Sequence, residues 1–201
     1  NDVGVPMTLL NAKTSDDAIV VEMGMRGFGE IERLSYCSRP DIAVITNIGN
    51  AHLGRLGSRK NIAKAKCEVT SYLHPDGIVV IPYGETLLEE YLSKCWAGRV
   101  SRVAIDEKPS RKDVGVLEHS RESEFVPDYL GILDLDSQTL LVDGTSLRLP
   151  LEGKHNAMNF MLALAVAKEL GVPFECLGNV KVKMLPGRNN LIRHKSLMIM
   201  D

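Results

Sequence analysis

The sequence predicts an α/β protein whose mostly parallel sheet is flanked by helices and carries a small antiparallel β subsheet. The first observation is that short apolar runs alternate with amphipathic, helix-like segments over residues 17–105. Continuous apolar runs of this kind are typical of strands that helices cover on both faces. The second observation is that residues 106–151 contain closely spaced strand-like runs without helices between them, which is typical of antiparallel strands.

The alternating part predicts four strands and three helices. We expect strands over residues 18–22, 41–46, 77–82 and 100–105. We expect helices over residues 30–37, 58–73 and 85–96. Strands that alternate with helices in this way indicate α/β architecture with a parallel sheet.

The segment 106–151 predicts antiparallel strands that lie outside the main sheet. Its strand-like runs are 114–117, 129–135, 139–142 and 146–149. The last two runs are separated by Asp143-Gly144, a dipeptide that strongly favours a hairpin turn. A long helix is expected over 154–170, ended by Gly171, followed by a short helical piece after Pro173 and a last strand at 196–200.

Composition and charge exclude several classes of function. The 201 residues carry a formal net charge of -2, with 24 basic and 26 acidic side chains, so the charge indicates no nucleic-acid-binding surface. No apolar stretch approaches the roughly 20 residues that cross a bilayer, and no signal peptide is recognisable. The four cysteines are too scattered for a metal knuckle or a redox pair. We therefore expect a protein of a reduced compartment, without membrane or nucleic-acid partners.

Lys66 stands out on the predicted helix 58–73. Ile62, Val69 and Leu73 form an apolar stripe along this helix, and Lys66 falls among them. An ammonium group on a buried stripe is costly unless it is paired, deprotonated or chemically altered, so Lys66 is a candidate functional residue. A lysine that extends from the edge of the stripe into solvent explains the same spacing equally well.

Polar side chains follow the first two predicted strands. Glu22 closes the first strand, Asn47 follows the second, and His52 lies five residues farther along the chain. Ligands of parallel sheets gather at the carboxyl ends of the strands. A carboxylate and an imidazole at this edge can hold a divalent ion such as Mg²⁺. In the alternative interpretation, Glu22 caps a helix or forms an ion pair, and His52 is simply exposed.

Three further residues are candidates for nucleotide binding. Asn156 and Asn159 share one face at the start of the predicted helix 154–170, where two side-chain amides can read the edge of an adenine base. The same asparagines can equally be helix caps. Arg188 follows a Pro-Gly turn that fixes its direction, and an arginine so placed suits a phosphate.

Six motifs occur along the chain in an order and spacing that resemble those of a known family. They are Asn1-Asp-Val-Gly-Val-Pro6, Glu22-Met-Gly-Met-Arg-Gly-Phe-Gly-Glu-Ile31, Asn47-Ile-Gly-Asn-Ala-His52, Ala65-Lys-Cys-Glu68, Gly153-Lys-His-Asn-Ala-Met-Asn159 and Pro186-Gly-Arg188. Together they resemble the central, ATP-binding domain of the Mur ligases over essentially all 201 residues. The first two motifs are most similar to the branch of this family that adds D-alanyl-D-alanine to UDP-N-acetylmuramoyl-tripeptide.

The resemblance implies a P-loop-type sheet and an activity in the synthesis of peptidoglycan precursors. Family members use ATP and Mg²⁺ to form an amide bond through an acyl phosphate. By position, the resemblance makes Glu22 a ligand of the Mg²⁺ bound to ATP, His52 a catalytic residue and ligand of a second Mg²⁺, and Lys66 a catalytic lysine whose N-carbamate supports that metal. It also places Asn156 and Asn159 beside the adenine and Arg188 near the phosphates.

The resemblance also predicts that residues 1–201 are part of a longer protein. In the family, a P-loop ending in Gly-Lys-Thr/Ser precedes these motifs, and further domains bind the uridine nucleotide and bring the amino substrate. We expect the chain alone to be inactive, and the intact enzyme to be monomeric and cytoplasmic, or stromal in a plastid. The alternatives are another ligase of this architecture, such as folylpolyglutamate synthetase, and a non-catalytic nucleotide-binding relative, against which Glu22, His52 and Lys66 together speak.

Overall fold

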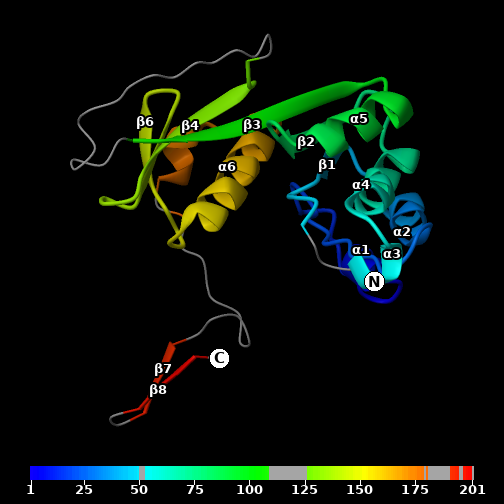
Figure 1. Cartoon of the computed structure of the whole chain (residues 1–201), viewed down its shortest axis with the longest axis horizontal. Helices are drawn as coiled ribbons and strands as arrows, with labels where there is room; N and C mark the ends of the chain where they lie inside the picture. Colours follow the sequence, from blue (N-terminus) through cyan, green and yellow to red (C-terminus); the bar gives the residue numbers. More distant parts are fainter. Residues whose placement is uncertain (50–52, 109–125, 179, 181–190, 195–196, 201) are drawn as a thin grey trace.

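The computed structural model describes residues 1–49, 53–108, 126–178 and 180, and the backbone of 191–194 and 197–200. Its main feature is one six-stranded sheet in which the strands follow each other in sequence order (Figure 1). The strands are β1 (Ile42–Val44), β2 (Ile78–Pro82), β3 (Arg99–Glu107), β4 (Tyr129–Asp134), β5 (Thr139–Val142) and β6 (Thr145–Arg148). Neighbours from β1 to β4 are parallel, and those from β4 to β6 are antiparallel.

Helices cover this sheet on both faces. They are α1 (Gly4–Leu10), α2 (Glu30–Ser38), α3 (Leu53–Leu56), α4 (Arg59–Cys67), α5 (Thr86–Cys95) and α6 (Lys154–Glu169), with 3₁₀ turns η1 (Glu68–Tyr72) and η2 (Phe174–Leu177). Strand β2 separates two cores: Val79 and Ile81 pack with α2, α4 and α5, whereas Val80 packs with α6. Because successive strand residues point to opposite faces, α4 and α6 lie on opposite sides of the sheet.

The α/β architecture predicted from the sequence is confirmed. The expected strands at 41–46, 77–82 and 100–105 correspond to β1, β2 and β3, and the expected helices at 30–37, 58–73 and 85–96 correspond to α2, α4 with η1, and α5. The long helix is α6, which ends before Gly171 at a left-handed φ of 76°, and the short helical piece after Pro173 is η2. The last strand is β8 (Leu197–Met200), paired with β7 (Leu191–His194) in a separate two-stranded sheet (Figure 1).

The strand expected at residues 18–22 is wrong, because this segment is irregular. Ile19 is 48% exposed and Val20 is 90% exposed, so the apolar run is not buried. A strand needs a neighbour that satisfies its backbone groups, and β1 is the edge of the sheet as far as the structure describes it. Local apolar character alone therefore does not create a strand here.

The antiparallel strands expected within residues 106–151 are confirmed, but their position outside the main sheet is wrong. Asp143 and Gly144 have φ angles of 47° and 78°, as a tight hairpin requires, and they join β5 to β6. Strand β4 extends the main sheet because β3 is nine residues long: its first half pairs with β2, and its second half is left for β4. The strand expected at 114–117 lies outside the described residues.

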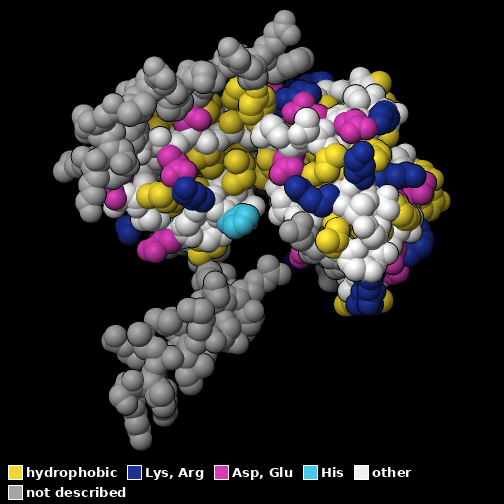
Figure 2. All heavy atoms as spheres, in the orientation of Figure 1, with side chains coloured by type: hydrophobic (Ala, Val, Ile, Leu, Met, Phe, Trp, Pro, Cys, Tyr) yellow, Lys and Arg dark blue, Asp and Glu magenta, His cyan; other side chains and the backbone are white. Residues whose placement is uncertain are grey.

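The surface of the described residues carries both signs of charge. In the face shown in Figure 2, basic and acidic side chains are interspersed over the helices and over the β4–β6 part. This distribution agrees with the net charge of -2. Within the described residues, no helix combines the length and the apolar character that crossing a lipid bilayer would need.

The alternation in β5 gives a direct test of the core around α6. Leu140 is fully buried, whereas its neighbour Leu141 is 41% exposed. We expect Leu140→Ala to lower the free energy of unfolding of the chain by about 2–5 kcal/mol, because it leaves a cavity in the core. The matched control Leu141→Ala should cost less than about 1 kcal/mol. Urea unfolding followed by circular dichroism measures both values, and equal costs would contradict the described orientation of β5.

Candidate functional site

Helix α4 has a well-defined start and a buried face. The Ser58 side chain accepts a hydrogen bond from the backbone N–H of Asn61 at 3.1 Å, and this bond caps the first turn. The residues buried on this helix are Ile62, Ala63, Ala65 and Cys67. Because Ala63 and Ala65 are small and fully buried, α4 packs closely onto the core beneath it.

Lys66 lies beside the loop that follows β1. Its Nζ donates a hydrogen bond to the backbone carbonyl of Asn47 at 2.7 Å, and its side chain is half-buried. Burial lowers the pKa of the Lys66 ammonium below its usual value, because removal from water disfavours the charged form. Lys66 therefore neither lies deep in the core nor extends freely into solvent. Its amine is held at the carboxyl end of a strand and is easier to deprotonate than that of an ordinary lysine.

The other thiol and amide groups near Lys66 are structural. Burial raises the pKa of the neighbouring Cys67 thiol to about 12, so Cys67 stays neutral and contributes to the core. The side chain of Asn47 accepts a hydrogen bond from the backbone N–H of Gly49 at 3.0 Å, which shapes the turn after β1. Ile48 between them is buried and anchors this turn to the core.

Glu22 is exposed in the irregular segment before α2. Within the described part of the chain, no hydrogen bond or ion pair engages its carboxylate, so the group is available to a ligand. Among the described residues, no three His, Cys, Asp or Glu side chains form a metal-binding group. His52 lies outside these residues, so the expected convergence of Glu22, His52 and Lys66 stays a prediction.

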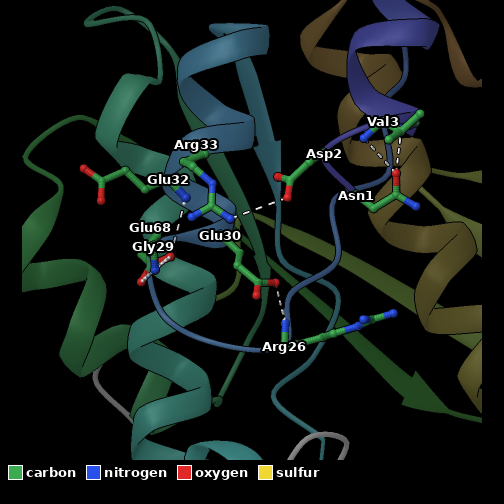
Figure 3. A network of polar contacts seen from close by, with 10 residues as sticks. Asn1, Asp2, Val3, Arg26, Gly29, Glu30, Glu32, Arg33 and Glu68 are labelled. Atoms are coloured by element: carbon green, nitrogen blue, oxygen red, sulfur yellow. Dashed lines mark hydrogen bonds and ion pairs between the residues drawn. The ribbon is translucent and has the colours of Figure 1, made fainter.

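Glu68 connects the segment after Glu22 to the helix that carries Lys66 (Figure 3). Its two carboxylate oxygens accept hydrogen bonds from the backbone N–H of Gly29 at 2.8 and 2.9 Å. The N–H of Glu32 donates to the same carboxylate at 3.4 Å. Our sequence analysis missed this role, although Glu68 lies in the motif of Lys66. The available signal was Gly29, a helix-start residue without a side chain to cap its own helix.

The start of α6 lies on the other face of the sheet. Gly153 precedes the helix with a φ of 98° and offers no side-chain cap. The Asn156 amide donates to the backbone carbonyl of Glu152 at 2.7 Å, so it braces the chain entering the helix. Asn159 is exposed and has no hydrogen-bond partner among the described residues. Arg188, the third candidate for nucleotide binding, lies outside them.

Comparison with known proteins identifies the family. The model of the Mur ligase middle domain matches residues 1–167. The chain belongs to the Mur ligase family. Two similar relatives of this Mur ligase chain are both named UDP-N-acetylmuramoyl-tripeptide–D-alanyl-D-alanine ligase. The one from Synechocystis sp. is 34% identical over 94% of the chain and 37% of the relative, and the one from Escherichia coli is 32% identical over 94% of the chain and 40% of the relative.

Solved structures agree with this assignment. A crystal structure of MurF from Acinetobacter baumannii matches all of the Mur ligase chain and 42% of its own chain, with a TM-score of 0.77 and 28% identity. The MurF ligase from Thermotoga maritima, solved in complex with ADP, matches with a TM-score of 0.69 at 22% identity and shows the shared fold. The chain thus spans about two fifths of the length of these relatives. The resemblance to the Mur ligases found in the sequence is confirmed.

The lowered pKa of Lys66 can be measured directly. In the folded chain, the ¹³Cε resonance of Lys66 should titrate at a lower pH than in the urea-unfolded chain, because only folding removes its amine from water. The unfolded chain then binds this proton more tightly. The unfavourable contribution of Lys66 to stability is therefore full below the folded pKa and is lost as the pH rises from there to 10.5. A folded pKa equal to or above the unfolded value would contradict the described burial.

Proposed function

We propose that this chain is part of an ATP-dependent ligase that joins D-alanyl-D-alanine to UDP-N-acetylmuramoyl-tripeptide. The observation that carries the proposal is the Lys66 amine, desolvated and held at the end of β1 inside a Mur ligase middle domain. The names of the Synechocystis and Escherichia coli relatives supply the substrates. The intact protein would be monomeric and cytoplasmic, would contribute to peptidoglycan precursors and would bind neither nucleic acid nor membrane.

The proposed reaction has two steps. A carboxylate oxygen of the tripeptide attacks the γ-phosphorus of ATP, so that ADP leaves and an acyl phosphate forms. The amine of D-alanyl-D-alanine then attacks the acyl carbon, a C–N bond forms, and phosphate leaves as the amine loses a proton. When bound with ATP, Mg²⁺ neutralises charge on the transferred phosphoryl group. Such catalysis depends on positioning, and we assign that task to this chain.

Lys66 would act as an N-carbamate. A neutral amine adds to CO₂ and releases a proton, and the burial of Lys66 enlarges the neutral fraction. The product replaces a half-buried cation by an anion that a nearby metal ion balances. Glu22 and His52 would complete the set of metal ligands. The available Glu22 carboxylate suits Mg²⁺, which prefers oxygen ligands and accepts few from the protein.

The nucleotide would bind at the start of α6. Asn156 and Asn159 would flank the adenine, and Arg188 would reach the phosphates. The exposed and unpartnered amide of Asn159 supports this role, as does the Thermotoga maritima relative solved with ADP. No specific observation favours folylpolyglutamate synthetase, since the Lactobacillus-type enzyme titled L. casei FPGS shares 16% identity and a TM-score of 0.57, which shows the fold alone.

Substitution of Lys66 in the full-length protein tests the proposal. Lys66→Ala should abolish the release of phosphate that depends on D-alanyl-D-alanine, while the fold stays near intact because a polar group leaves a half-buried position. Added formate or acetate should restore part of the activity by supplying a carboxylate in the vacated space. The matched control Lys60→Ala removes an exposed lysine from the same helix and should leave turnover unchanged. Unchanged turnover in Lys66→Ala would rule out the carbamate.

A further inference from the structure

We propose that Glu68 is a positioning residue that fixes the segment carrying Glu22 against the helix carrying Lys66. The inference rests on the proposed function and extends it, because it assigns a residue that sets the separation of two predicted metal ligands. Glu68 itself is no ligand in this proposal. Its carboxylate faces the start of α2, where it accepts hydrogen bonds from backbone N–H groups (Figure 3).

The start of α2 lacks a cap of its own. Gly29 occupies the N-cap position with a left-handed φ of 77° and has no side chain. The first N–H groups of a helix have no partner within the helix and need an acceptor. In a self-capped helix, a serine or aspartate at the N-cap accepts from the third residue inside. Here Glu68, 39 residues farther along the chain, accepts from Gly29 and also from Glu32.

This arrangement does more than stabilise a helix end. A cap on residue 29 itself would satisfy the same N–H groups without linking α2 to α4. Placing the acceptor on η1 makes the start of α2 depend on the position of the Lys66 helix. The cost is a third carboxylate near Glu30 and Glu32, which the positive end of the α2 dipole offsets.

Two more contacts show that the helix of Lys66 holds loops on two sides. Lys64 lies one turn before Glu68, and its Nζ is 5.5 Å from the centre of the Phe28 ring. Lys64 and Glu68 thus hold adjacent residues of one segment. Lys66 points to the other side and holds the carbonyl of Asn47. The same turn of helix therefore contacts the loop after Glu22 and the loop that leads to His52.

The body of α2 is anchored independently of Glu68. The buried hydroxyl of Ser35 donates to the carbonyl of Val69 at 2.7 Å and accepts from the N–H of Tyr72 at 3.3 Å. Ile31 and Leu34 are buried in the core beneath α2. Loss of Glu68 should therefore free the first turn of α2 and the segment before it, while the rest of the helix stays in place.

The experiment uses the full-length protein with Glu68→Ala, Glu68→Gln and the control Glu90→Ala. Glu90 is a glutamate of α5 whose partner is Lys94 one turn away, so its removal leaves the start of α2 untouched. Hydrogen exchange at the amides of Gly29 and Glu32 should accelerate about tenfold in Glu68→Ala, because a charge-assisted bond is lost. Glu68→Gln keeps one oxygen acceptor and should fall between, while exchange at Tyr72 stays unchanged in all variants.

The second measurement is the Mg²⁺ concentration that gives half-maximal turnover. Glu68→Ala should raise it several-fold and leave the KM for D-alanyl-D-alanine unchanged, since only the proposed metal ligands lose their alignment. Unchanged amide exchange would overturn the proposal, and so would faster exchange with an unchanged Mg²⁺ requirement, which would make Glu68 a simple helix cap. A wild-type protein without ligase activity would instead contradict the proposed function, and amide exchange would still decide whether Glu68 holds the segment.

Discussion

The close packing of α4 on the core is the constraint on which the candidate site depends. Ala63 and Ala65 present almost no side chain to the core, so the helix backbone approaches the layer that contains Val79 and Ile81. Such packing leaves little freedom for rotation or sliding of the helix. The polar residues on the rest of α4 and on η1 therefore project from a fixed frame. Their hydrogen bonds to Asn47 and Gly29 transfer this order to two loops that would otherwise have few constraints.

The two faces of the sheet separate two chemical tasks in the proposed enzyme. Groups for the metal ions project from the α4 side, and amides for the nucleotide base project from the start of α6. Strand β2 lies between these layers, with alternate residues packed into each core. A phosphate chain that reaches from base to metal would have to pass the carboxyl edge of the strands. Parallel sheets place their ligands at this edge because all their strands end there.

Local patterns in the sequence predicted most of the frame and part of the site. The stripe through Ile62 and Val69 identified the helix of Lys66, and Asp143-Gly144 identified the turn between β5 and β6. Features that depend on distant partners were not accessible in this way. Residues 18–22 have strand-like composition but no strand beside them among the described residues, and the role of Glu68 depends on Gly29, a residue 39 positions away. The length of β3, which decides where β4 attaches, was also underestimated.

The shared strand β3 restricts how this domain can change during evolution. Val103 is aligned with Pro82 of β2 on one side and with Tyr129 of β4 on the other. A deletion or insertion of one residue near this point would shift both ladders together, and a shift by one residue turns every side chain of a strand to the opposite face. Val103 and its neighbours would then exchange the α6 core for the opposite layer. Substitutions can accumulate in β3 as long as they keep the alternation, whereas its length is fixed by two neighbours at once.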